Sequence, residues 1–262
     1  MIAILSVVAT LGLEAAANFV NRTATSLSRE RLQAVDEALD GYFKIYGRLP
    51  CPAVRSYNQA DASLNYGLEN CSGAIAINSG GVGNGLYAGA VPYRTLNMPV
   101  SYSLDGFSNK VNYVVTVNLT SAGGSSGVYG RFASSGGTSA QNGTAGIEVR
   151  TGELAQPCNA SNCQVIADPA ASPPSGAAYF LFSNGADQRG AVTMNGVAIN
   201  ACIVYANEIR VDTENCLLGG SHTGMALTTI PNNVFYDNRY NPGLNLASYY
   251  DDVAVWRSKA QL

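Results

Sequence analysis

Few residues of this 262-residue chain have the types and spacing needed for catalysis. His222 is the only histidine and lies in the glycine-rich stretch GGSHTGM, so a serine–histidine nucleophile pair has little support. Glu148 and Glu153 lie close enough in sequence to be considered as the two carboxylates of a glycosidase. We expect their short segment to be exposed and both side chains to be solvated. The sequence therefore predicts that this chain is not an enzyme.

Six cysteines occur in a chain with few charged residues. An even number in such a composition is typical of proteins from an oxidising compartment. The chain has no C-x-x-C pair, and its single histidine gives little support to a metal site. We therefore predict disulfides. Many pairings are open, and proximity in sequence favours Cys51–Cys71, Cys158–Cys163 and Cys202–Cys216.

Three aspartates are the best candidates for binding a cation. Asp187 lies in the segment SNGADQRG, and Asp251 and Asp252 are adjacent near the end of the chain. Carboxylate and carbonyl oxygens are the ligands that Ca²⁺ takes, about six to eight at a time. The alternative is that Asp187 closes an Asx-type turn and Asp252 forms a cap or an ion pair.

The N-terminal part of the chain is predicted to be a single helix. No proline occurs before Pro50, and the first thirteen residues carry no charge before Glu14. From Leu32 to Tyr46, apolar residues recur every three or four positions, and charged residues occupy the opposite face. We therefore predict a helix over 1–46 with an apolar first half and an amphipathic second half.

This helix is too long to be covered by the rest of the chain. It would measure roughly 70 Å, whereas the remaining residues would form a body with a radius of gyration of roughly 17 Å. Its first half is therefore expected to protrude as a signal peptide, a membrane anchor or a polymerisation helix. A signal peptide has a basic start, which is missing here. A bilayer anchor needs about 20 apolar residues, and Glu14 and Asn18 interrupt the run.

Residues 47–262 are predicted to form a globular, β-rich domain with long loops. Stretches rich in β-branched and aromatic residues predict strands at 111–117, 177–183, 197–205 and 251–256. Low-complexity loops are expected at 121–146 and 168–176. We therefore predict an α+β fold in which the helix packs on a mostly antiparallel sheet. The net charge of −3 gives no reason to expect nucleic-acid binding.

Tyrosine is unusually frequent, with 15 residues against one tryptophan. Several lie in expected loops, where they predict either a glycan-binding surface or seams between subunits. These are Tyr57, Tyr66, Tyr87, Tyr236 and Tyr240.

Four segments, in order along the chain, resemble the type IV pilin superfamily, particularly prepilin-like proteins and the pseudopilins of type II secretion. The stretch RERLQAVDEALDGYFKIYGRLPCPA resembles the second half of the pilin helix and its closing turn. LDGFSNKVNYVV resembles the segment that leads into a pilin strand. FLFSNGADQRGAV is similar to a pseudopilin loop, and YYDDVAVWRS to the closing strand. One difference is that pilins carry a glutamate close to the mature start, where this chain has Leu5.

The resemblance implies a structural subunit that forms an extracellular filament at the cell surface as a homopolymer. It also implies residence in the inner membrane before assembly, and pilus or secretion assembly machinery as a partner. The apolar helix would pack against other copies through van der Waals contacts. Its expected contact residues are Ile2, Ile4, Leu5, Val7, Val8, Leu11 and Leu13.

Two further expectations follow from the resemblance. Glu14 is expected either to pair inside the helix bundle, with Arg22 or the terminal amine of a neighbour, or to lie at its wet junction. A structural calcium at Asp187, Asp251 and Asp252 is implied by the pseudopilins, and no other cofactor is expected. The alternatives are a pseudopilin or minor pilin of a secretion system and, from a different class, a membrane-tethered carbohydrate-binding or hydrolytic domain.

Overall fold

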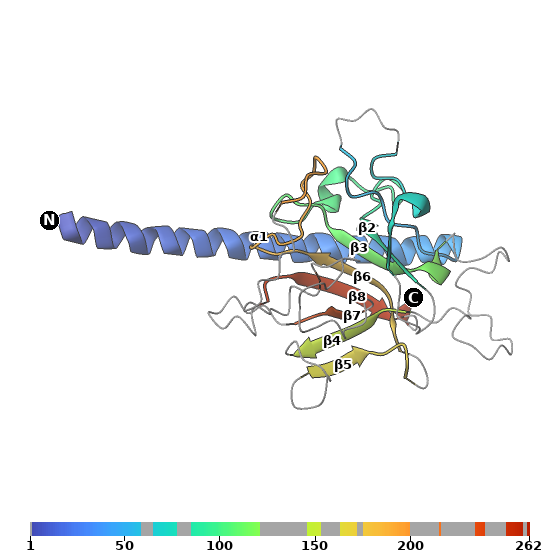
Figure 1. The fold of residues 1–262 in the computed structure, drawn as a ribbon. Coiled ribbons are helices and arrows are strands. Elements are labelled where there is room, and N and C mark those ends of the chain that lie inside the picture. The colour runs from blue at the N-terminus through green and yellow to red at the C-terminus, as the bar shows by residue number, and fades with distance from the viewer. Residues whose placement is uncertain are drawn as a thin grey trace.

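The computed structural model describes a helix and eight strands within residues 2–58, 65–77, 85–120, 146–152, 163–171, 175–199, 215, 234–238, 250–258 and 261–262. Side-chain surroundings are described from Ala16 onward. Figure 1 shows the elements in chain order: α1 (Ile2–Tyr46), β1 (Ile75–Ile77), β2 (Leu86–Ala90), β3 (Asn112–Thr116), β4 (Glu148–Gly152), β5 (Cys163–Ala167), β6 (Ala177–Ser183), β7 (Val234–Tyr236) and β8 (Val253–Ser258). Short 3₁₀ turns lie at Cys71–Gly73, Val100–Ser103 and Val117–Leu119.

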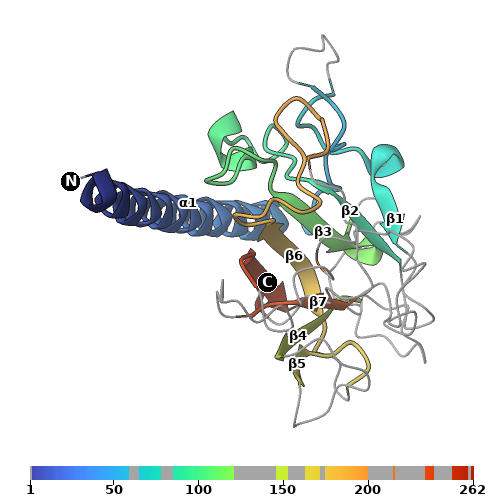
Figure 2. The same ribbon diagram turned by 60° about the vertical axis from the view of Figure 1, so that its left-hand side comes forward.

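The strands form two sheets. The larger has the order β1-β2-β3-β6-β8, and every neighbouring pair is antiparallel. The smaller has the order β5-β4-β7, in which β4 and β7 run parallel. An isolated antiparallel bridge between Ile147 and Ala177 connects the two sheets. Figures 1 and 2 show α1 lying along the larger sheet and extending beyond the strands at its N-terminal end.

The larger sheet is the middle layer of the domain because its central strands are buried on both faces. Tyr179 and Leu181 of β6 face α1 in one hydrophobic cluster. Phe180 and Phe182, the alternate residues, belong to a second cluster with the smaller sheet. The Phe180 ring lies 5.1 Å from that of Phe235 in β7. This two-sided burial explains why the sequence of β6 is continuously apolar.

The helix packs on the sheet through a stripe of buried residues. The stripe has helical spacing and runs along Ala24, Ser28, Leu32, Val35, Leu39, Tyr42 and Phe43. After Tyr46, Gly47 takes a positive φ of 66° and its N–H donates to the Phe43 carbonyl oxygen at 2.8 Å, which ends the helix.

The turn before β3 fits directly against the helix. Gly106 N–H donates to Ser28 Oγ at 2.9 Å, and Arg31 donates to the carbonyl oxygens of Leu104 and Asp105 at 3.1 and 2.8 Å. The buried Asp105 carboxylate accepts from the backbone N–H groups of Phe107 and Asn109 and from Ser183 Oγ of β6. This turn therefore connects the helix with the two central strands.

The predicted α+β class is confirmed, with a helix packed on a mostly antiparallel sheet. Three strand predictions correspond to β3, β6 and β8. The strand predicted over 197–205 is wrong in its described part, because residues 197–199 form only one isolated bridge, between Val192 and Ala198. Residues 200–205 and most of the predicted loop at 121–146 lie outside the described residues. The division between 1–46 and 47–262 stays a prediction.

Two glycines provide a matched test of this packing. A Cβ at Gly106 would overlap the Ala24 backbone carbonyl, so we expect Gly106→Ala to destabilise the fold by about 1–3 kcal/mol. A Cβ at Gly41 of α1 would meet none of the described atoms within 4 Å. Gly41→Ala should therefore stabilise the helix by about 0.5–1 kcal/mol. Urea unfolding would measure both changes, and equal effects of the two substitutions would contradict this helix–turn contact.

Candidate functional site

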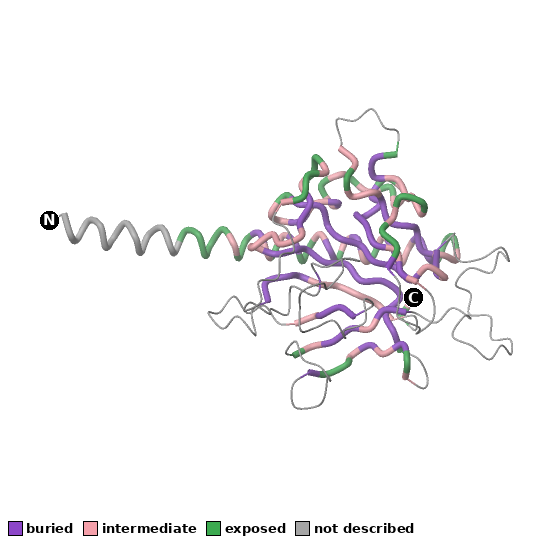
Figure 3. Tube along the Cα trace, in the orientation of Figure 1, coloured by how far each residue is buried: buried purple, intermediate pink, exposed green. Residues whose placement is uncertain are grey.

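The candidate site is the part of α1 that the domain leaves uncovered. The first residue of the helix that is buried within the described part is Ala24, and Ala16 to Val20 are all exposed. Phe19 and Val20 are 71% and 62% exposed, and Figure 3 shows this exposed stretch leading out of the domain. Large apolar side chains exposed in this way on a long helix make this stretch a candidate surface for contact with another molecule or a lipid phase.

The predicted polymerisation residues precede this exposed stretch. The backbone is helical from Ile2 onward, but the side-chain surroundings of the predicted residues, which extend to Glu14, lie outside the described part of the structure. Their contacts therefore stay a prediction. At about 1.5 Å per residue, the helix between Ile2 and Thr23 measures about 33 Å. Within the residues whose side chains are described, no helical stretch is long and apolar enough to cross a membrane.

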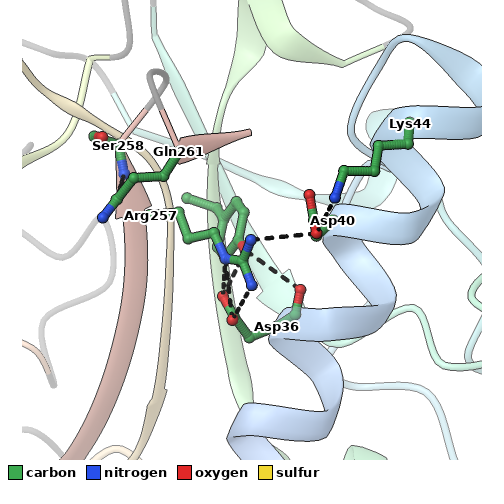
Figure 4. Close-up of polar contacts among 7 residues, drawn as sticks. Asp36, Asp40, Lys44, Arg257, Ser258 and Gln261 are labelled. Atoms are coloured by element: carbon green, nitrogen blue, oxygen red, sulfur yellow. Dashed lines mark hydrogen bonds and ion pairs between the residues drawn. The ribbon is translucent and has the colours of Figure 1, made fainter.

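A charged network fixes the other half of α1 to the last strand, as Figure 4 shows. Arg257 of β8 donates to Asp36 through Nε and Nη2, the latter at 2.7 Å. Tyr179 also donates to Asp36, at 2.6 Å. Arg257 forms a second ion pair with Asp40 at 3.3 Å, and Asp40 accepts from Lys44 at 2.6 Å. The hydrogen bonds with Asp36 raise the pKa of Arg257, so this guanidinium stays charged.

A second network holds the turn that follows the helix. Arg48 and Glu69 form a bidentate pair with distances of 2.7 and 2.8 Å. Glu69 also accepts from the Cys51 backbone N–H at 3.1 Å. Cys51 forms the predicted disulfide with Cys71. Ion pair and disulfide together connect the end of α1 with the segment before β1.

The described part of the structure confirms one of the three predicted disulfides. Cys163 is also disulfide-bonded, but its predicted partner Cys158 lies outside the described residues. Cys202 and Cys216 lie outside them as well. Both pairings stay predictions.

The three aspartates proposed for calcium do not point to one place. Asp251 Oδ2 accepts from the Asp187 backbone N–H at 2.8 Å, which brings two of them together. The Asp187 carboxylate is in turn 3.2 Å from Arg189 Nε, whose positive charge disfavours a cation. Asp252 accepts instead from Asn215 Nδ2 at 3.0 Å. Among the described residues no group of three or more His, Cys, Asp and Glu is arranged to hold a metal, and calcium stays a prediction.

The other predicted chemical groups have structural contacts or are not described. Glu148 pairs with Arg150 on β4, and Glu153 and His222 lie outside the described residues. The prediction that these tyrosines lie on a surface is wrong for two of them. Tyr66 and Tyr236 are buried, and Tyr57 and Tyr87 pack against the helix-side core. Tyr66 and Tyr236 therefore lie in the interior, and Tyr57 and Tyr87 are half-buried.

A buried lysine beside a half-buried arginine was not predicted from the sequence. Lys110 is 3% exposed, and it donates to the carbonyl oxygens of Arg55 and Tyr57. Arg55 donates to the Gly190 carbonyl oxygen at 2.6 Å. In the described part of the chain neither cation forms an ion pair with a carboxylate. Burial, together with the charge of Arg55, lowers the pKa of Lys110 to about 8.

Comparison of the chain with protein-family models, with curated proteins and with solved structures finds no match. The function must therefore be argued from the geometry of the chain itself.

The buried Lys110 predicts a specific pH dependence of stability. Its pKa is about 8 in the folded state and 10.5 in an unperturbed lysine. Between these values the unfolded chain binds more protons, so the free energy of unfolding must rise with pH. The rise is at most about 3.5 kcal/mol, since one pKa unit corresponds to about 1.4 kcal/mol.

Urea unfolding of the wild type and of Lys110→Met from pH 8 to 10.5 measures this effect, because other groups that titrate in both proteins cancel in the difference. We expect the stability of the wild type to rise relative to the variant. Parallel curves would contradict the buried, desolvated state of Lys110.

Proposed function

We propose that this chain is a structural subunit that polymerises through its N-terminal helix into an extracellular filament of the type IV pilin kind. The observation that carries this proposal is the exposure of Phe19 and Val20 on a helix that continues beyond the domain. Each of these side chains would gain about 1.5–3 kcal/mol on full burial. The side chains before Glu14 carry no charge, so the free energy gained by burying the helix against other copies increases toward its start.

In this account, the apolar start of the helix lies in the inner membrane before assembly, and the domain lies outside. Assembly exchanges lipid contacts for helix–helix contacts with other copies, which small residues such as Ala15 to Ala17 allow to be close. Glu14 interrupts the apolar run and must find a partner or water, because an unpaired buried carboxylate is costly. Arg22 of a neighbouring copy is one such partner.

The docked half of the helix supports the same role. Its buried stripe and its ion pairs with Arg257 fix the helix rigidly to the domain. A pull or a packing force on the exposed half is therefore transmitted to the sheet, as a filament subunit requires. In a tethered monomer only lipid or detergent would surround the exposed half.

Negative-stain electron microscopy of the purified, untagged protein tests the proposal. We expect filaments from the wild type and none from Val8→Glu, because a charge in the apolar helix cannot be buried in a bundle without a partner. Gln164→Glu, which adds the same charge at an exposed position of β5 outside the helix, is the matched control for a loss of solubility or folding.

Monodisperse, detergent-bound particles in all three samples would contradict the proposal. That result would favour a membrane-tethered carbohydrate-binding or hydrolytic domain.

A further inference from the structure

The charged residues of α1 divide into two groups of equal size. Eight of them have described side-chain surroundings. Four are bound within the chain: Arg31 to the turn before β3, and Asp36, Asp40 and Lys44 in the network with Arg257. The other four are exposed and form no hydrogen bond or ion pair within the described residues. These are Arg22, Arg29, Glu30 and Glu37.

The spacing of the four exposed charges is regular. Arg22 and Arg29 are seven residues apart, as are Glu30 and Glu37. Seven residues are close to two helical turns, so each pair lies along one line of the helix surface. None of the four has an opposite charge three or four residues away, where a partner on the same helix would have to be. Burial raises the pKa of the Asp237 carboxyl, and the charge of Arg29 only partly opposes that rise.

The two lines have the same internal spacing and are displaced by eight residues. A second, parallel copy of α1 shifted by eight residues, about 12 Å, therefore aligns both pairs at once. We propose that this surface binds a second copy of the chain, with Arg22 opposite Glu30 and Arg29 opposite Glu37 of the second copy. This inference rests on the proposed function, which requires the apolar helix starts of neighbouring copies to meet. The parallel arrangement places all these starts on the same side.

The geometry also favours a continuing assembly over a closed dimer. Eight residues correspond to a rotation of about 80° around the helix axis, so the arginine line and the glutamate line lie on different faces. Each copy then uses one face toward one neighbour and the other face toward the next. Such a head-to-tail interface propagates into a filament unless it closes into a ring.

An antiparallel pair would also match the charges, with Arg22 opposite Glu37 and Arg29 opposite Glu30. It would place the two uncovered apolar helix starts at opposite ends, where neither covers the other. Exposed ion pairs are individually weak, so their role in the parallel arrangement is to select the stagger. The apolar contacts supply the main attraction.

Cysteine cross-linking distinguishes these arrangements. After assembly and mild oxidation, the double variant Arg22→Cys/Glu30→Cys is expected to give a ladder of covalent multimers on non-reducing gels, since every copy is linked to two neighbours. The matched control Arg22→Cys/Glu37→Cys should remain monomeric. A closed dimer from the control would establish the antiparallel pairing and overturn the proposal.

Charge reversal provides a second, independent readout in case the added thiols disturb the native disulfides. Arg22→Glu/Arg29→Glu should reduce filament number several-fold, and adding Glu30→Arg/Glu37→Arg should restore it. If the wild type forms filaments but the cysteine variant gives no ladder and the second charge reversal restores nothing, the proposed register is overturned and the proposed function stands. The absence of wild-type filaments would overturn both.

Discussion

The structure depends on the docking of one helix onto the central strands of a sheet. Four large apolar residues of the stripe, Leu32, Val35, Leu39 and Phe43, are buried against β3, β6 and β8. Burial of each side chain contributes about 1.5–3 kcal/mol, and a hydrogen bond to a charged group contributes about 1.5–3 kcal/mol. The four apolar side chains together therefore contribute more than the half-buried ion pair between Asp36 and Arg257. Apolar burial therefore supplies the affinity of the helix for the sheet, and the ion pair selects its register.

The same docking creates the exposed surface. The helix has 45 residues, and in its described part it is buried only between Ala24 and Phe43. The strands that it packs on are much shorter than the helix, so the sheet covers only part of it. The buried stripe begins at Ala24, and Phe19 and Val20 before it are 71% and 62% exposed. Exposure of Ala16 to Val20 is thus a consequence of helix length and not of a local defect in packing.

The sequence predicted those parts of the fold whose signals are local. The helix, β3 and β6 have strong periodicity or continuous apolar character, and the Cys51–Cys71 loop is short. β4 and β7 were missed because they are short and pair across long sequence separations, and β4 includes charged residues. The Asp36–Arg257 pair joins residues 221 positions apart, and only the tertiary fold could reveal it. Likewise, composition could count the tyrosines but not place Tyr66 and Tyr236 in the interior.

The central claim is that other copies of the chain cover the exposed half of the helix. Its most direct test is electron spin resonance of a label at Phe19→Cys in the assembled protein, with and without dilution by unlabelled chain. The account predicts strong dipolar broadening between labels on different copies, and its loss on dilution. Narrow, dilution-independent spectra with continued access to a water-soluble relaxation agent would contradict it.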